Sequence, residues 1–211
     1  MFAIANAFVY VRRLPRGSGG TLDSFEALIA TILRSQGYWV HPSFKVELSK
    51  QDKADIGSPS SPRWELDLIA YRGAVNEVLV VECKSYLDSR GVLFSTFTAG
   101  AKLSERYKLF ANTKIREVVL GRLERQLVER GFCPPAPRIV LCLAAGNIAS
   151  DKGGRNRAAL RELFDKSRWR LFDEDWLFER LMCLAASGYE NDVGIMVAKL
   201  YSKRANGVGA S

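Results

Sequence analysis

The sequence predicts an α/β fold, in which a central mixed sheet of four or five strands is flanked by helices. Strand-like apolar runs alternate along the chain with segments whose apolar residues recur at helical spacing. Two of the strand-like runs are joined by a connection short enough for a β-hairpin. The length of 211 residues suits one domain. We expect a single domain over residues 1–211, with a core over about 22–172, an N-terminal extension over 1–20 and C-terminal helices over 173–203.

The N-terminal part is expected to hold an extension, a helix and a strand. Residues 1–16 could contain a short strand, which a flexible Gly/Ser run ends. Asp23 begins a helix whose apolar residues recur at helical spacing, and Gly37 ends it. Residues 38–48 are rich in aromatic and β-branched side chains, which indicates a strand interrupted near Pro42.

The middle of the chain predicts the β-hairpin. Residues 49–62 are polar and rich in Ser, Pro, Asp and Lys, so we expect a loop there. Residues 64–71 and 77–84 then form two strong strands with a short connection, which favours an antiparallel pair. The run Val78–Val81 is apolar on both faces, which is typical of a central strand covered on both sides.

The remaining residues continue the alternation of helices and strands. Helical spacing from about residue 98 to residue 130 predicts two helices, which Gly131 and the prolines after it end. Further elements are expected as a strand over 138–145, a helix over 155–166, a short strand over 169–172, and helices over 173–186 and 192–201.

The hairpin carries the residues that point most directly to a chemistry. Glu82 and Lys84 are two apart on a strand, so both side chains leave the same face, and Asp67 is expected across from Glu82. Two adjacent carboxylates repel each other unless a cation lies between them. Hard oxygen ligands suit Mg²⁺ or Mn²⁺. The alternative is a solvent-exposed strand end with an ordinary ion pair.

These residues also resemble the core motif of a known superfamily. The segment Trp64-Glu65-Leu66-Asp67-Leu68-Ile69, followed by Val80-Val81-Glu82-Cys83-Lys84, is similar to that of the PD-(D/E)XK, or restriction-endonuclease-like, nucleases. The preceding helix with Glu26, running into residues 33–40, resembles the first helix and strand of that superfamily. The resemblance covers roughly residues 22–145. It departs from the motif at one position, because Leu66 stands where a proline is expected.

The resemblance implies a restriction-endonuclease-like fold and a role for each matching residue. Asp67 and Glu82 match the acids that bind the metal, and the backbone carbonyl of Cys83 could be a further ligand. Lys84 matches the lysine that acts on the attacking water or on the reacting phosphate. Glu26 matches the helix-borne acid that often completes the site. Glu26 also lies three residues after Asp23, so a capping box is its alternative role.

The charge of the chain favours a polyanionic partner. The net charge is +8, although a merely solvated basic surface would give the same number. A basic group at the start of the helix expected over 155–166 is the better candidate for phosphate contacts, since helix starts suit phosphates. That group consists of Lys152, Arg155, Arg157 and Arg161, and a second one contains Lys102 and Arg106. Acids interleaved after the second group indicate that part of it is ordinary helix pairing.

Other classes are disfavoured by what the sequence lacks. Its single histidine, His41, has no carboxylates around it, which argues against histidine-based hydrolases. The four cysteines form no CxxC pair, so neither a zinc cage nor a disulfide framework is indicated. No apolar run approaches the roughly 20 residues of a membrane span, and the N-terminus does not resemble a secretory signal. We therefore expect a cytoplasmic protein without a membrane partner.

The functional expectation is a Mg²⁺- or Mn²⁺-dependent endonuclease acting on double-stranded DNA, of restriction, repair or defence type. A homodimer would make it easier to cut both strands. Three alternatives remain open: a non-catalytic nucleic-acid-binding module that keeps the fold, an RNA-acting nuclease, and a basic interaction protein. Retention of Asp67, Glu82 and Lys84 together argues against the first alternative.

Overall fold

A computed structural model describes residues 23–57, 63–97, 104–151, 153–188 and 191–207. The strand expected within residues 1–16 lies outside this described part, as do Lys102 and Lys152. None of the described helices combines the length and the apolar character that a membrane crossing requires.

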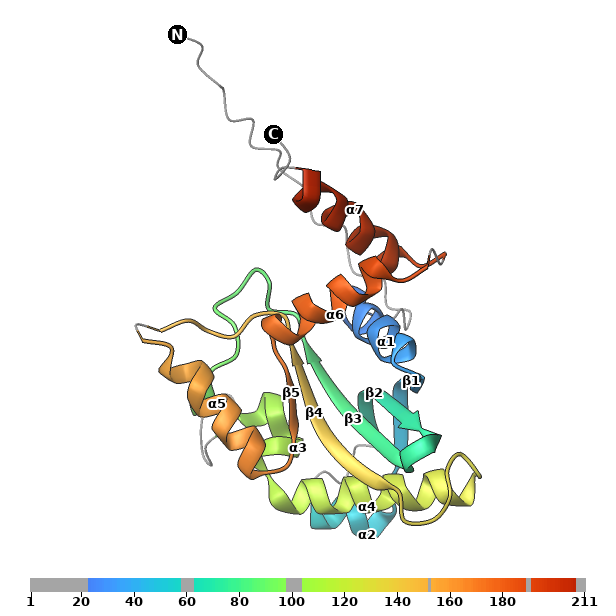
Figure 1. Cartoon of the computed structure of the whole chain (residues 1–211). Coiled ribbons are helices and arrows are strands. Elements are labelled where there is room, and N and C mark those ends of the chain that lie inside the picture. Colours follow the sequence, from blue (N-terminus) through green and yellow to red (C-terminus); the bar gives the residue numbers. More distant parts are fainter. Residues whose placement is uncertain (1–22, 58–62, 98–103, 152, 189–190, 208–211) are drawn as a thin grey trace, which may run out of the picture.

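A five-stranded mixed sheet forms the centre of the molecule (Figure 1). Its strands follow one another in sequence order: β1 (Trp39–Glu47), β2 (Arg63–Arg72), β3 (Glu77–Lys84), β4 (Arg138–Ala145) and β5 (Arg170–Phe172). The first three strands pair antiparallel, whereas β3–β4 and β4–β5 pair parallel. The predicted mixed α/β sheet and its hairpin are therefore confirmed.

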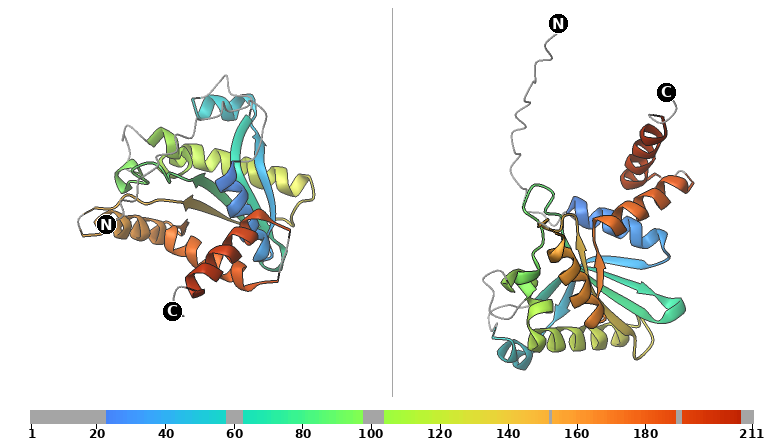
Figure 2. Two further views of the ribbon diagram at one scale, coloured as in Figure 1. Left: turned by 90° about the horizontal axis from the view of Figure 1, so that it is seen from above. Right: turned by 60° about the vertical axis from the view of Figure 1, so that its left-hand side comes forward.

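Helices cover both faces of this sheet, as the two further views make clear (Figure 2). One face carries α1 (Ser24–Ser35) and α6 (Glu174–Ala186), and α7 (Val193–Gly207) packs against α6 on their outer side. The other face carries α3 (Lys108–Ala111), α4 (Thr113–Glu129) and α5 (Arg155–Lys166). The parallel connections into β4 and β5 pass through helices, as parallel crossovers require.

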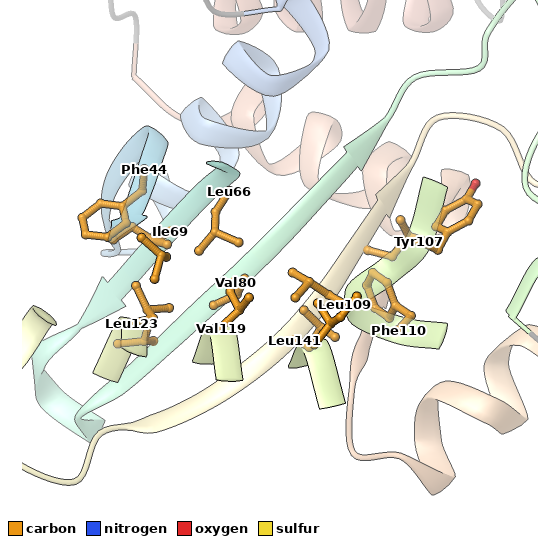
Figure 3. Close-up of a cluster of buried hydrophobic side chains, with 14 of the residues drawn as sticks. Phe44, Leu66, Ile69, Val80, Tyr107, Leu109, Phe110, Val119, Leu123 and Leu141 are labelled. Atoms are coloured by element: carbon orange, nitrogen blue, oxygen red, sulfur yellow. The ribbon is translucent and has the colours of Figure 1, made fainter. Parts of the chain in front are cut away.

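The core has two halves because successive residues of a strand point to opposite faces. On β3, Val78 and Val80 pack toward α4, while Leu79 and Val81 pack toward α1. Figure 3 shows the α4 half, in which side chains of the sheet meet those of α3 and α4. This two-sided burial of β3 is what the apolar run in the sequence predicted.

The prediction of a loop over residues 49–62 is wrong at its start. The structure has a short helix there, α2 (Lys50–Asp55). Ser49 caps it, since its side chain accepts from the Asp52 N–H and the Asp52 carboxylate accepts from the Ser49 N–H. Asp52 also pairs with Arg122 of α4 at 2.5 Å. This contact across the fold stabilises a helix whose composition alone resembles a loop.

The hairpin end of β3 is fixed by a buried carboxylate. Glu77 is 1% exposed and forms an ion pair with both Arg138 and Arg170. Its Oε1 also accepts a hydrogen bond of 2.8 Å from the Tyr38 hydroxyl. A buried charge needs such partners, and together they connect the start of β3 to the residue that precedes β1, to β4 and to β5. The opposite end of β3, where Glu82 lies, is thereby held on a rigid strand.

Candidate active site

Asp67 and Glu82 face each other where the β2–β3 ladder ends. The last paired residues of the ladder are Leu68 and Val81, and one further step in the same register brings Asp67 opposite Glu82. The Cys83 N–H donates to Oδ2 of Asp67 at 2.7 Å, so the carboxylate continues the contact between the strands beyond that last pair. This register agrees with the cross-strand position predicted for Asp67.

Lys84 and Glu82 leave β3 on the same face, as the strand alternation predicted. The Lys84 Nζ donates to Oε1 of Glu82 at 2.5 Å, and each side chain is only about one-fifth exposed. Burial acts against the charge of Lys84, yet Glu82 and then Asp67 raise its pKa above the usual value. Lys84 therefore stays protonated and positively charged beside the carboxylates.

Glu26 of α1 belongs to the same patch. Its pKa is raised to about 7, first by burial and then by the charges of Asp67 and Asp23, while Lys84 lowers it. A hydrogen bond with the Asp23 backbone also lowers this pKa, and the Asp23 side chain accepts from the Phe25 N–H. Glu26 therefore takes part in the helix cap and also interacts with the carboxylates of the hairpin. The structure supports a capping contact for Glu26, while its role in completing a metal site stays a prediction.

The electrostatics of the patch favour an added cation. Burial and then the charge of Asp67 raise the pKa of Glu82, although Lys84 acts in the opposite direction. The charge of Asp67 thus raises the pKa of both Glu26 and Glu82, whereas Lys84 lowers the pKa of both. A divalent cation would relieve this repulsion.

The Cys83 backbone N–H reaches Asp67, and the buried Cys83 thiol lies near enough to Asp67 and Glu26 for their charges to add to the rise in its pKa. Within a strand, the N–H and C=O of one residue face the same neighbour. Because the Cys83 N–H reaches Asp67, its carbonyl also faces this side, beyond the last ladder pair. The thiol is buried in the core under α1, and burial raises its pKa well above the usual value. A role for Cys83 would therefore use the carbonyl oxygen.

The donor set fits a hard cation in its chemistry. Within the described part of the chain, no group of three or more His, Cys, Asp or Glu side chains is arranged to hold a metal ion as it stands. Mg²⁺ binds through only one or two carboxylates and retains several waters. Asp67, Glu82 and the Cys83 carbonyl offer oxygen ligands of this kind, and no soft ligand is exposed among them.

Two tyrosines adjoin the patch, and the sequence reasoning did not identify them. The Tyr86 and Tyr107 hydroxyls are 3.5 Å apart. The pKa of Tyr107 is raised by burial, by its bond to Tyr86 and by the charge of Glu82. Tyr86 contributes to the raised pKa of Lys84. Tyr86 could have been identified from the sequence, because it lies two residues after Lys84. Tyr107 could not, because only the tertiary fold brings it to the patch.

The arginines predicted to contact phosphate have different surroundings. Arg157 pairs with Glu174 at 2.7 Å, and Arg161 pairs with Asp173 at 2.5 Å. Both guanidinium groups are thus engaged by acids at the start of α6. Arg155 is 85% exposed, and its nearest acid, Asp151, is 3.8 Å away. Of these three, Arg155 is the one most open to a ligand.

Arg106 and His41 also have definite positions. Arg106 is exposed and lines a groove with Tyr86 and Tyr107, next to the carboxylate patch. His41 is exposed on β1, where its ring packs edge-on against Phe44 with ring centroids 5.2 Å apart. The structure brings Arg106, but not His41, to the candidate site.

Comparisons with known proteins add no relative: no family model matches the sequence, and neither a curated protein nor a solved structure matches it.

Proposed function

We propose that this protein is a Mg²⁺- or Mn²⁺-dependent nuclease with a restriction-endonuclease-like fold, which hydrolyses phosphodiester bonds in DNA. The observation that carries the proposal is the crowding of Asp67, Glu82 and Glu26 around Lys84 at one end of a buried hairpin. These residues come from two strands and a helix. The resemblance of their sequence pattern to the PD-(D/E)XK motif supports the same function.

Each residue has a role that its surroundings suit. Asp67 and Glu82 would hold the cation, and the Cys83 carbonyl faces the same side. The cation would polarise a phosphoryl oxygen and lower the pKa of a bound water. Lys84 stays protonated, so its ammonium is placed to orient the attacking water or to stabilise the charge that develops on the phosphate. Glu26 adds a third carboxylate beside Asp67, which would help to complete the cation site as the resemblance implies.

The alternative of a non-catalytic binding module has less support from the geometry. A module that only binds a polyanion gains nothing from three carboxylates beside its surface, because they repel phosphates. The charges around Lys84 also cost stability without a cation, since burial and mutual repulsion raise the pKa values of Glu26 and Glu82. Such an arrangement is typical of a site that is kept for a reaction.

Cleavage of supercoiled plasmid DNA tests the proposal. The purified protein should nick or linearise the plasmid with Mg²⁺ or Mn²⁺ and should lose this activity in EDTA. Asp67→Asn and Glu82→Gln should reduce cleavage to background, because the amides preserve shape and hydrogen-bond acceptors but remove the charge. Glu65→Gln is the matched control, since Glu65 is an exposed acid on the same strand as Asp67.

The outcomes separate the competing functions. Activity in the control together with inactive Asp67 and Glu82 variants supports the assignment. Cleavage of an RNA of the same sequence, with the DNA left intact, would make the protein a ribonuclease with the same site. Binding of DNA without any metal-dependent cleavage would support the binding module instead.

A further inference from the structure

A groove of about 310 Å³ adjoins the candidate active site. It lies between the loop that follows β3 and the short helical turn η3 (Ser104–Tyr107). Its lining includes Tyr86, Ser89, Arg90, Arg106 and Tyr107. The groove lies next to the carboxylate patch, because Tyr86 interacts with Lys84 and Tyr107 interacts with Glu82. Figure 3 shows the Tyr107 hydroxyl pointing out of the core cluster.

The wall formed by the loop after β3 is held in place by the segment after β4. The Asn147 side-chain amide donates to the carbonyls of Tyr86 and Ser89, at 3.3 and 2.8 Å. Gly91 has a φ of 92° and approaches Asn147 so closely that an added Cβ would lie 2.7 Å from its carbonyl oxygen. Tyr86 itself has a φ of 44°, a left-handed conformation that a non-glycine residue adopts only under constraint. The groove is therefore built on a fixed loop.

Two arginines give the groove its charge. Arg90 and Arg106 are both exposed, and neither forms an ion pair within the part of the chain that the structure describes. The acid beside Arg106, Glu105, is paired with Lys108 at 2.9 Å. These two guanidinium groups thus differ from those of Arg157 and Arg161, which acids already engage. Guanidinium groups and hydroxyls are the donors that bind phosphate oxygens in proteins.

We propose that this groove binds the nucleic-acid backbone next to the bond that is cut, with Arg90 and Arg106 contacting its phosphates. This inference rests on the proposed function and adds the surface that guides the substrate strand to Asp67 and Glu82. Tyr86 and Ser89 supply hydroxyls along the wall of the groove. A strand lying in the groove would pass directly beside the Lys84 ammonium, because Tyr86 is close to both.

Binding without cleavage tests the groove separately from the catalytic centre. Fluorescence anisotropy of a 5′-fluorescein-labelled DNA oligonucleotide is measured in EDTA over a series of salt concentrations, for the full chain and for Arg90→Ala/Arg106→Ala. Each lost phosphate contact should reduce the slope of log K against log salt by about 0.7–0.9. The matched control is Arg125→Ala, since Arg125 is an exposed arginine on α4. Thermal melts verify that all variants fold.

The results test phosphate binding in the groove separately from the proposed nuclease activity. A reduced slope and weaker binding in the double variant, with Arg125→Ala like the wild type, support the groove. Equal slopes in the double variant and the wild type overturn it, whether or not the wild type cuts plasmid DNA. Absence of any DNA binding at low salt overturns it as well. A groove-dependent affinity in a protein that never cleaves supports the groove and refutes the nuclease.

Discussion

At the scale of single residues, Lys84 has the most sharply defined environment in the candidate site. Its ammonium lies 2.5 Å from Glu82. It stays protonated because Glu82 and Asp67 raise its pKa by more than burial lowers it. A cation cannot coordinate Mg²⁺ as a carboxylate does. Its contribution should therefore appear in the transition state and affect turnover more than ground-state binding.

Lys84→Met should accordingly lower the rate of DNA cleavage by about 10²–10⁴-fold, the range for a positioned proton-transfer group. Affinity for metal and for DNA should stay close to that of the wild type. Lys45→Met is the control, because Lys45 is an exposed lysine on β1. If Lys84 only neutralises Glu82, the variant will instead melt at a lower temperature and cleave normally. Measuring both quantities on the same variant decides between the two roles.

Glu26 should make the folded protein less stable as the pH rises. Its pKa rises from 4.5 to about 7 in the folded protein, mainly through burial and the charge of Asp67. The folded state therefore holds this proton more tightly than the unfolded state. The resulting contribution to stability is fully present below pH 4.5 and is lost as the pH rises through about 7.

Glu26→Gln should remove this dependence. Urea unfolding of the metal-free protein at several pH values between 4.5 and 8 should show the wild type losing stability relative to the variant as the pH rises. The comparison isolates Glu26 because other groups titrate in both proteins. A difference in unfolding free energy that stays constant over this range would contradict the pKa assigned to Glu26.

The sequence could predict some of these residues and not others. Asp67, Glu82 and Lys84 follow from the two-residue period of a strand and from a short hairpin connection, both of which are local. Tyr107 and Arg106 reach the site from a segment that follows β3 through residues 85–103, so no spacing rule connects them to Lys84. The pairing of Arg157 and Arg161 with acids of α6 also depends on how α5 and α6 pack.

At the scale of elements, the loop after β3 depends on a close backbone approach at Gly91. A side chain there would meet the Asn147 carbonyl and the Ala149 nitrogen, at 2.7 and 2.8 Å, and would require a φ of 92°. Gly121 is the contrasting case, because it lies within α4 and an added Cβ would meet nothing within 4 Å.

Gly91→Ala should therefore destabilise the protein by about 1–3 kcal/mol, the usual cost of a strained backbone conformation. Gly121→Ala should stabilise it by about 0.5–1 kcal/mol, since alanine is favoured over glycine within a helix. Urea unfolding measures both. Similar unfolding free energies for the two variants would show that the loop after β3 shifts easily and that it is not a fixed wall of the groove.

Most element boundaries could be predicted because periodicity and capping are local signals. The strand β4 and the helix α5 have the bounds expected from the sequence. The helix α2 was missed because the composition of residues 49–62 is typical of a loop. The ion pair between Asp52 and Arg122 of α4 stabilises the helix, and that pairing depends on the tertiary fold. The turn of the hairpin was placed correctly, and its left-handed residue is Asn76.

At the scale of the whole molecule, the sheet order explains why the residues of the candidate site meet. Each strand pairs with its neighbours in the sequence, so the β2–β3 hairpin occupies the centre and α1 crosses the face next to it. Glu26 on α1 and Asp67 and Glu82 on the hairpin thereby reach one end of the sheet. The net charge of +8 would favour approach of a polyanion toward this end through Arg90 and Arg106.

In the proposed site, Asp67 and Glu82 share a divalent cation. Crystals grown with Mn²⁺ allow a direct measurement, because anomalous difference density identifies the ion and its position. We expect a peak bound by carboxylate oxygens of both Asp67 and Glu82, at the distances of about 2.0–2.6 Å typical of hard cations. If a saturating Mn²⁺ concentration leaves no peak between these two residues, or places the ion elsewhere, Asp67 and Glu82 do not share a cation and the proposed site is wrong.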